Sequence, residues 1–218
     1  MFGHSSIATE VDAMNSQKNK KIASEAHLER VADVDLPSRF GEFRLVGFMG
    51  PNGEELMACV KGDVENARSV PVRMHSECFT GDVLGSYRCD CRDQLEAALT
   101  LIGRSERGAV LYLPQEGRGI GLLNKLKAYA LQDQGMDTVE ANHALGFEDD
   151  LRDYSLAAEM LHQLSVQSVC LLTNNPKKIS GLQDHGIQVD GVIPIRMTPN
   201  EHNSRYLDTK RTKSGHLL

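Results

Sequence analysis

Three cysteines are the residues in this sequence whose type and spacing most clearly allow chemistry. Cys89 and Cys91 stand one residue apart in "YRCDCRDQLE", and Cys78 lies upstream in "HSECFTGD". Thiolates prefer zinc among the common metals, and alternate residues of an extended segment point to the same side, as adjacent ligands must. The three cysteines therefore form a candidate zinc site that is one protein ligand short of closure.

The fourth position of that site admits more than one interpretation. Water there would make the site catalytic, whereas His75 or Cys59 there would make it structural. The thiols could also be buried and unpaired. Three thiolates overcompensate the charge of Zn²⁺, so water in a catalytic site would need help from a neighbouring base or cation. Cys59 and Cys170 stand within apolar strands and are expected in the core.

A glycine-rich loop, "QEGRGIG" (115–121), joins an apolar strand to a helix. Glycines let backbone N–H groups approach a ligand, and the N-terminus of the next helix favours anions, so the loop is a candidate phosphate site. It matches neither the Rossmann nor the Walker pattern, and a tight turn between strand and helix is the alternative.

The segment "LLTNNPKK" (171–178) repeats this arrangement. Pro176 begins a helix, and Lys177 and Lys178 stand in its first turn, where the helix dipole disfavours cations. A bound phosphate would explain the two lysines, and plain solvation is the alternative. Two anion sites together suggest a nucleotide triphosphate.

A third charged segment is "GFEDDLRDY" (146–154), which carries Asp150 and Arg152 near a helix start. Acidic residues are ordinary at that position of a helix. Taken alone, the segment is interpreted as a solvated charged turn.

Composition limits the function classes. The chain has 218 residues, 40% hydrophobic and 25% charged, with a net charge of −6. It has no apolar run of membrane-spanning length and no basic stripe for nucleic acid, so neither a membrane nor a nucleic acid is an expected partner. Five cysteines are an odd number, and no signal peptide is recognisable. We therefore expect a reducing, cytoplasmic compartment.

The patterning predicts one mixed α/β domain over residues 31–218 after a flexible extension, residues 1–30. Antiparallel hairpins come first, and strand–helix units around a mixed sheet follow. The expected strands are 41–50, 54–63, 69–77, 108–113, 168–173 and 187–195, and the expected helices are 94–103, 122–135, 153–164 and 174–186. The C-terminal segment is interpreted as a polar, basic tail.

Several ordered blocks together resemble one family. They are "RMHSECFTGD", "RCDC", "YLPQEGRGIGLLNKLKAYALQDQGMDTVEANHALGF", "DLRDY", "LLTNNPKK" and "NSRYLDTKRTKSGH". The set is similar to GTP cyclohydrolase II, the zinc enzyme at the entry to riboflavin synthesis, from about Val31 to Leu218. The resemblance is to the single-domain form, because residues 1–30 are too few for the dihydroxybutanone-phosphate synthase domain that is often fused upstream.

The resemblance implies a reaction. GTP loses pyrophosphate, C8 of guanine leaves as formate, and 2,5-diamino-6-(5-phosphoribosylamino)pyrimidin-4(3H)-one remains. It further implies that Cys78, Cys89 and Cys91 hold one Zn²⁺ per chain with water in the fourth position. Mg²⁺ is expected with the triphosphate, and the family forms homodimers.

The resemblance also implies residue roles. Arg152 matches the nucleophile toward the α-phosphate, Asp150 its proton acceptor, and Tyr129 the tyrosine beside the opening imidazole. The residues that match the GTP contacts are Arg73, Met74, His75, Ser76, Glu77, Gln94, Glu116, Gly117, Arg118, Thr138, Thr173 and Lys178.

One position departs from the family pattern, because Arg92 follows "CDC" where the family usually has glycine. If that glycine needed a positive φ, Arg92 would be strained and would tilt the zinc ligands. The register of Gln94 and Glu96 instead favours ordinary helical angles for Arg92.

Other functions compete with this interpretation. A related GTP hydrolase could stop at the formamide or serve another pathway, and a paralogue could bind zinc and nucleotide without turnover. A zinc nucleobase deaminase is excluded, because its combination of H-x-E with P-C-x-x-C is absent.

Overall fold

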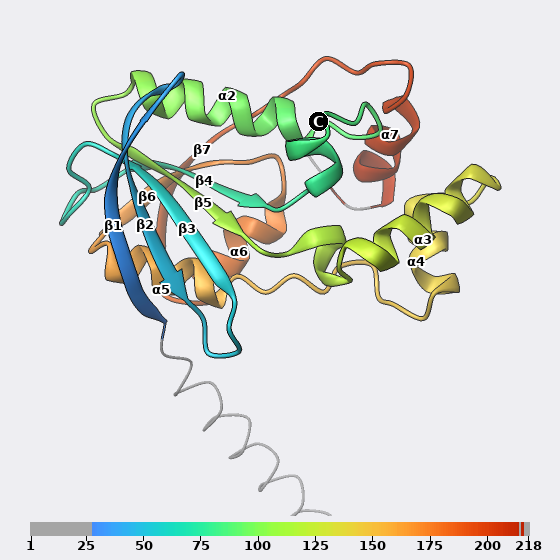
Figure 1. Cartoon of the computed structure of the whole chain (residues 1–218), viewed down its shortest axis with the longest axis horizontal. Coiled ribbons are helices and arrows are strands. Elements are labelled where there is room, and N and C mark those ends of the chain that lie inside the picture. The colour runs from blue at the N-terminus through green and yellow to red at the C-terminus, as the bar shows by residue number, and fades with distance from the viewer. Residues whose placement is uncertain (1–27, 214, 216–218) are drawn as a thin grey trace, which may run out of the picture.

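The structure is a computed structural model that describes residues 28–213 and residue 215. Its centre is one seven-stranded sheet with the order β1-β2-β3-β5-β4-β6-β7, which confirms the mixed α/β class (Figure 1). Most of the extension predicted over residues 1–30 lies outside the described residues, and β1 begins at Glu29.

The bounds of the elements agree closely with the sequence pattern where that pattern is strongly periodic. The strands are β1 (Glu29–Ser38), β2 (Gly41–Met49), β3 (Glu55–Lys61), β4 (Val70–Ser76), β5 (Gly108–Leu113), β6 (Ser168–Leu172) and β7 (Gln188–Ile193). The helices are the short turns η1 (Phe79–Val83) and η2 (Glu116–Gly119), and α2 (Cys91–Arg104), α3 (Leu122–Asp133), α4 (Thr138–Ala144), α5 (Ser155–Gln163), α6 (Pro176–Gln183) and α7 (Ser204–Lys213).

The first half of the sheet is antiparallel. β2 and β3 form the predicted hairpin, with Met49 paired to Glu55 across the turn. In β3, Leu56, Ala58 and Val60 are buried and alternate with more exposed residues, which is the period of a strand with one face in the core. β3 then pairs antiparallel with β5, so the hairpins continue directly into the second half.

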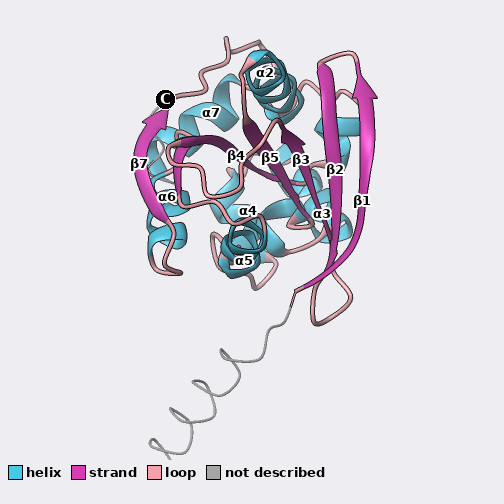
Figure 2. Cartoon of the chain, turned by 90° about the vertical axis from the view of Figure 1, so that its left-hand side faces the viewer, coloured by secondary structure: helices cyan, strands magenta, loops and turns pink. Residues whose placement is uncertain are grey.

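The second half of the sheet is parallel and is covered on both faces. β4 pairs with β5 and β6, and β6 pairs with β7, all parallel. Helix α2 covers one face through Ala98 and Ile102, while α5 and α6 cover the other (Figure 2). Because parallel strands end at the same edge, the segments that follow β4, β5 and β6 meet there, as expected for the ligand-binding edge of such sheets.

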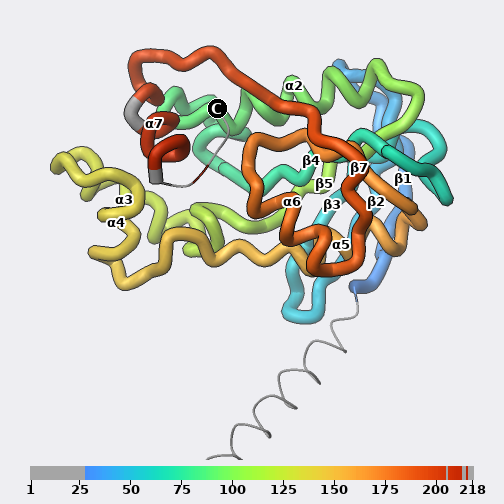
Figure 3. The backbone as a smooth tube through the Cα atoms, turned by 180° about the vertical axis from the view of Figure 1, so that it is seen from behind, coloured from blue at the N-terminus to red at the C-terminus, as the bar shows by residue number. Residues whose placement is uncertain are grey.

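Two helices were not expected from the sequence. Helix α4 begins with a capping box between Asp137 and Glu140. Helix α7 replaces the predicted polar tail; the chain crosses from β7 over the parallel edge and reaches the segment before α2 (Figure 3). Its pattern is weak because it is anchored by few buried residues, among them Leu207 and Lys210.

Candidate active site

A cleft at the parallel edge brings together nearly all the residues predicted for the site. It is bounded by the ends of β4 and β6, the starts of α2 and α6, the η2 loop, α3 and α7. Its lining includes Arg73, His75, Ser76, Glu77, Cys78, Cys89, Cys91, Gln94, Glu116, Gly117, Arg118, Tyr129, Thr138, Arg152, Thr173 and Lys178.

Two predicted residues reach the cleft indirectly. Met74 has its side chain in the core, and its carbonyl oxygen accepts a hydrogen bond from Lys178 Nζ over 2.7 Å. Asp150 stands behind Arg152 and binds its guanidinium. The lining also includes residues to which the sequence analysis gave no role, among them Arg88, Lys125, Tyr206 and Lys210.

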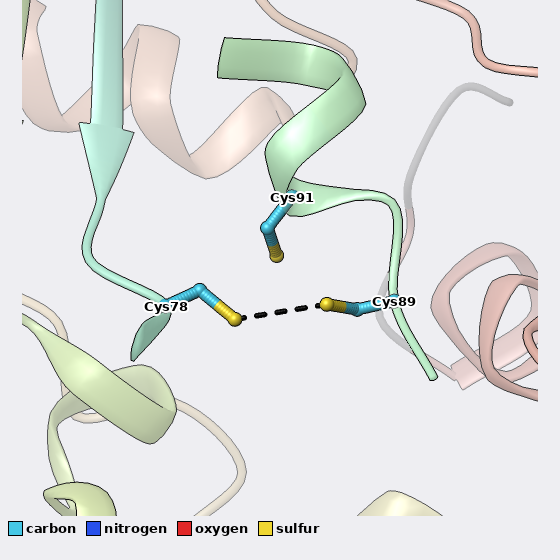
Figure 4. A group of neighbouring side chains, drawn as sticks. All are labelled: Cys78, Cys89 and Cys91. Carbon is cyan, nitrogen blue, oxygen red and sulfur yellow. Dashed lines mark hydrogen bonds between the residues drawn. The ribbon is translucent and has the colours of Figure 1, made fainter. Parts of the chain in front are cut away.

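The three thiols converge at one end of the cleft. Their sulfur atoms all lie within 4.8 Å of one another, and the sulfurs of Cys78 and Cys89 are 3.6 Å apart (Figure 4). Cys78 follows β4, whereas Cys91 is the first residue of α2. The prediction that Cys89 and Cys91 share an extended segment is wrong, because Asp90 between them has φ −106° and ψ 15° and turns the chain into the helix.

Neither residue proposed to close the thiol site does so. Among the described residues, the three cysteines are the only potential metal-ligand cluster of three or more His, Cys, Asp or Glu side chains. His75 Nε2 instead lies 3.0 Å from Asp82 Oδ2. Cys59 and Cys170 are half-buried in β3 and β6, outside the cluster.

The surroundings of the thiols fit a thiophilic divalent ion. A Cβ atom at Gly81 would lie 2.9 Å from the sulfur of Cys89 and 3.1 Å from that of Cys78, so the chain leaves space around the sulfurs that only glycine preserves. Hydrogen bonds from the Cys89 and Cys91 thiols, together with the nearby Lys125 ammonium, lower the pKa of Cys78. A thiolate is thus favoured even without a metal, and a set of soft sulfur ligands suits zinc.

Lys125 and Glu116 tie this site to the glycine-rich loop. Lys125 Nζ donates to Cys78 Sγ over 3.1 Å and to Glu116 Oε1 over 2.8 Å. The other oxygen of Glu116 accepts from the backbone N–H of Phe79, the residue after Cys78, over 2.7 Å. Tyr129, one turn after Lys125 on α3, places its hydroxyl 3.4 Å from Thr80 Oγ1. Lys125 supplies the neighbouring cation that a three-thiolate site requires.

The carboxylate of Asp82 holds the backbone of Cys78 in place. It accepts hydrogen bonds from the backbone N–H of Cys78 over 2.9 Å and from the Tyr112 hydroxyl over 3.0 Å, beside its contact with His75. His75 and Tyr112 also stack with their ring centroids 5.5 Å apart. Such outer contacts orient ligands before a metal arrives.

The opposite side of the cleft is rich in buried cations. Lys178 is 5% exposed, and among the described residues its ammonium donates only to a neutral carbonyl. Burial and then the charges of Arg73, Arg152 and Lys210 lower its pKa well below the ordinary value. Burial likewise lowers the pKa of Arg73 to about 10. A cation held among cations in a dry site is costly unless an anion joins it, so this wall fits a polyanion.

The two lysines of the predicted anion site therefore differ. Asn175 caps α6 by accepting from Lys177 N, and Pro176 stands at the first helical position, as expected. The Lys177 side chain is 61% exposed and therefore largely solvated, with its Nζ 3.9 Å from Asp150 Oδ2. Solvation does not describe Lys178, whose buried ammonium donates to the Met74 carbonyl of β4.

The glycine-rich loop is a strained turn beside the cleft. Gly117 and Arg118 both have left-handed backbone angles, with φ of 64° and 63°. The carbonyl of Arg118 accepts from Leu151 N over 3.0 Å, which brings the segment of Asp150 and Arg152 against the loop. A non-glycine residue rarely adopts such angles, and Arg118 does so at the edge of the site.

Arg92 introduces no backbone strain beside the thiols. It lies within α2, has no positive φ, and donates from Nε to Glu96 Oε1 over 3.1 Å. The expectation of ordinary helical angles is therefore confirmed, and the residue usually found there in the family is not required for this turn.

Fold and site together define a class: a mixed α/β enzyme domain whose cleft joins a cluster of three thiols to a wall of buried cations. Comparison with known families then names it more closely. The family model described as GTP cyclohydrolase II matches residues 29–194, and the chain belongs to that family.

Curated relatives agree with this placement. Riboflavin biosynthesis protein RibBA of Endomicrobium trichonymphae is 51% identical over 201 residues, covering 92% of this chain and 50% of that protein. The RibBA proteins of Bacillus velezensis and Bacillus subtilis are 55% and 54% identical, each over 88% of this chain and 48% of their own length. The chain thus spans about half the length of the relatives it matches. No helix in the described part of the chain is long and apolar enough to span a membrane.

Proposed function

We propose that this chain is a zinc-dependent GTP cyclohydrolase II that converts GTP to 2,5-diamino-6-(5-phosphoribosylamino)pyrimidin-4(3H)-one, formate and pyrophosphate, as the first step of riboflavin biosynthesis. The observation that carries the proposal is the juxtaposition, in one cleft, of a thiol cluster with buried cations. Family membership and the RibBA relatives support the choice of GTP and of the pathway.

The buried cations bind the triphosphate in this proposal. Lys178 approaches from the first turn of α6, Arg73 from β4 and Arg118 from the η2 loop. The negative charge of a triphosphate would offset the repulsion between Lys178 and the neighbouring cations. Thr173 adds a hydroxyl group at the same edge of the sheet. Mg²⁺ accompanies the phosphates as part of the substrate, coordinated by phosphate oxygens.

Arg152 stabilises charge on the phosphate that is cleaved, and Asp150 orients it. Burial alone would lower the pKa of Arg152, but the hydrogen bonds and charge of Asp150 outweigh it and raise that pKa. A guanidinium held so firmly in its protonated form has no free lone pair. We therefore assign Arg152 an electrostatic role rather than that of a nucleophile, with Asp150 fixing the plane of the guanidinium.

Guanine lies between the wall of cations and the thiols. Glu77 lines the cleft one residue before Cys78, and its carboxylate accepts no hydrogen bond from the residues that the structure describes. A carboxylate there accepts from N1–H and N2–H₂ of guanine, which adenine lacks. Tyr129 and Lys125 stand beside the thiols, where their hydroxyl and ammonium groups orient the imidazole ring and stabilise negative charge.

Zinc would be held by Cys78, Cys89 and Cys91. When bound in such a three-ligand site, it supplies Lewis acidity and an open coordination position for attack at C8. The chain's own contribution is to keep the thiols together through Asp82 and Gly81 and to place a cation, Lys125, against them.

Product analysis tests the proposal. The zinc-loaded chain is incubated with GTP and Mg²⁺, and the products are identified by mass spectrometry together with assays of formate and pyrophosphate. We expect equimolar formate and pyrophosphate with the diaminopyrimidinone. A formamide product would indicate the related enzyme that stops early, and absence of turnover with retained GTP binding would indicate a non-catalytic paralogue. ATP is the control substrate: turnover within about tenfold of GTP, roughly 1.4 kcal/mol of discrimination, contradicts the role of Glu77.

The homodimer is a further part of the proposal. Exposed apolar side chains gather after the first thiol, at Val83, Leu84 and Tyr87, and these suit an interface. Sedimentation equilibrium of the purified chain tests it, with a monomer at micromolar concentration as the contradicting result.

A further inference from the structure

The C-terminal helix α7 reaches the metal-binding loop through one buried ion pair. Lys210 Nζ donates to Asp90 Oδ1 over 2.9 Å, with side chains 9% and 2% exposed. Asp90 is the residue between Cys89 and Cys91. A cation 120 positions away in the sequence therefore acts on the residue that separates two of the three thiols.

Asp90 does not use its carboxylate as a helix cap. It occupies the N-cap position of α2, where aspartate ordinarily accepts from the first N–H groups, yet no such side-chain bond is made. Its second oxygen accepts from Gln94 Nε2 over 2.5 Å. Oδ1 thus makes a tertiary contact with α7 and Oδ2 accepts from a side chain in the first turn of α2, while neither oxygen caps a backbone N–H group.

These contacts continue across the cleft. Gln94 Oε1 accepts from Arg73 Nη2 over 2.5 Å, and Arg73 Nη1 donates to the carbonyl of Leu172 over 2.9 Å. A continuous chain of hydrogen bonds thereby joins α7, the metal-binding loop, α2, β4 and the end of β6. The loop is held between the C-terminal helix and the wall of cations.

Lys210 is itself held in place on the α7 side. Its Nζ lies 4.4 Å from the centroid of the Tyr206 ring, one turn earlier on the same helix. Because its charge is paired with Asp90, it differs from Lys178, which has no carboxylate partner among the described residues. Its geometry suits holding the loop rather than binding phosphate.

We propose that Lys210 is a positioning residue for the metal site: through Asp90 it holds the Cys89–Cys91 turn so that both sulfurs face Cys78. In the loop before Cys89, Leu84 and Tyr87 are exposed, and the Tyr87 ring stacks on His202, in the segment that leads into α7. Without Lys210, the carboxylate of Asp90 is left buried and uncompensated and the turn rearranges. This inference rests on the metal-site part of the proposed function.

The test measures how fast zinc is lost from the full, zinc-loaded chain to an excess of a chromophoric chelator. Lys210→Met is expected to lose zinc roughly 10- to 100-fold faster, the range for removed outer contacts of metal ligands. Arg211→Met is the matched control, because Arg211 is the next residue, carries the same charge and is 63% exposed. It is expected to lose zinc at the rate of the unsubstituted chain, and Lys210→Arg at a rate close to it.

A spectroscopic readout separates positioning from general loosening of the fold. With Co²⁺ in place of zinc, the thiolate-to-cobalt charge-transfer bands report ligand geometry; they are expected to change in Lys210→Met and not in Arg211→Met. If Lys210→Met does not fold, the double variant Asp90→Asn/Lys210→Met is used in its place, because it leaves no unpaired buried charge. The same fast loss of zinc is expected from the double variant.

The outcomes distinguish the two proposals. An unsubstituted chain that binds no stoichiometric zinc overturns the metal site and, with it, the role of Lys210. A folded Lys210→Met or double variant that keeps zinc as long as Arg211→Met, with an unchanged cobalt spectrum, overturns the role of Lys210 alone.

Discussion

Asp150 and Arg152 meet through two parallel hydrogen bonds, Nε to Oδ1 and Nη2 to Oδ2, each 2.8 Å long. The backbone N–H of Arg152 donates to the same carboxylate over 3.2 Å, and the two side chains are only 9% and 11% exposed. A bidentate pair of this kind fixes the plane of the guanidinium as well as its charge. The orientation of Arg152 in the cleft is therefore set before any ligand binds.

Replacing Arg152 by lysine tests whether that plane matters. Arg152→Lys keeps the positive charge but loses the planar, bidentate guanidinium. We expect pyrophosphate release to fall roughly 100- to 1,000-fold, which is the usual effect of removing one electrostatic stabiliser. Steady-state assays of pyrophosphate measure it. Glu148→Gln, an exposed change in the same segment, is the control. An Arg152→Lys enzyme with the rate of the unsubstituted chain would show that charge alone suffices.

Lys178 and its exposed neighbour Lys177 offer a second matched comparison. We expect Lys178→Met to weaken binding of the triphosphate roughly 10- to 100-fold, because a hydrogen bond to a charged group contributes about 1.5–3 kcal/mol. The ligand-free variant is expected to unfold at the same or a higher temperature, since a repelled buried charge is removed. Calorimetric titration and thermal unfolding measure the two effects.

The control for this comparison is Lys177→Met, which is expected to change both quantities little. Equal weakening in the two variants would mean that long-range charge, rather than the buried position of Lys178, determines anion binding.

Much of this site could be predicted from the sequence, and the exceptions have physical reasons. The hairpin of β2 and β3 and the α6 start at Pro176 follow from local patterns that the fold leaves unchanged. The three cysteines converge as predicted, although Cys89 and Cys91 do so at a turn into α2 rather than on an extended segment. Arg92 in the first turn of α2 belongs here too, because the register of the helix determines its backbone angles.

The residues that were missed act through contacts distant in sequence. Lys125 is an ordinary lysine of an amphipathic helix until the fold brings it to Cys78, and Lys210 belongs to a segment too polar to show a helical pattern. Asp90 has the sequence position of a helix cap but is used otherwise. Only tertiary packing reveals such roles.

Gly81 provides a prediction about space around the sulfurs. Gly81→Ala puts a methyl group 2.9 Å from Cys89 Sγ and 3.2 Å from Cys91 Cβ, so the thiols must separate. We expect zinc content to fall well below one per chain while circular dichroism is unchanged. Gly47→Ala is the control, because the nearest atom to its added methyl is 3.6 Å away, an ordinary contact. Full zinc content in Gly81→Ala would show that the thiols need no such space.

His75 gives the protein a predictable response to acid. Burial lowers its pKa, and the hydrogen bond to Asp82 opposes this only in part. Below the ordinary histidine pKa of about 6.5 the unfolded chain therefore takes up a proton that the folded chain refuses, so the contribution of His75 to stability is complete above about pH 6.5 and is lost as pH falls through the lowered pKa.

The free energy of unfolding should accordingly fall with pH in this window by up to about 1.4 kcal/mol per pH unit from this group. Denaturant unfolding from pH 7.5 to 5 measures it. His75→Gln is expected to flatten the slope, and the exposed His162→Gln to leave it unchanged. An identical slope in the unsubstituted chain and His75→Gln would remove His75 as its source.

The two chemical steps should be separable, because they depend on different sides of the cleft. Phosphate cleavage depends on Arg152 and Lys178, whereas attack at C8 depends on the thiol cluster. Arg152 donates to Asp150 and Lys178 to the Met74 carbonyl, and neither donates to a cysteine sulfur. Cys89→Ser should therefore still release pyrophosphate and leave a product with an intact guanine ring and no formate. Cys170→Ser, a half-buried thiol of β6, is the control and should retain both activities.

Arg152→Ala completes this test from the other side. If phosphate cleavage comes first, the variant should lose pyrophosphate and formate together, because the ring-opening step never receives its substrate. Assays of both products for each variant, with circular dichroism to verify the fold, decide between the models. Parallel loss of pyrophosphate and formate in a folded Cys89→Ser chain would mean that the steps are coupled through the metal site. Formate release that persists in Cys89→Ser would contradict the proposed role of the thiols in attack at C8. It would remove the chemical reason for bringing three thiols together beside Lys125.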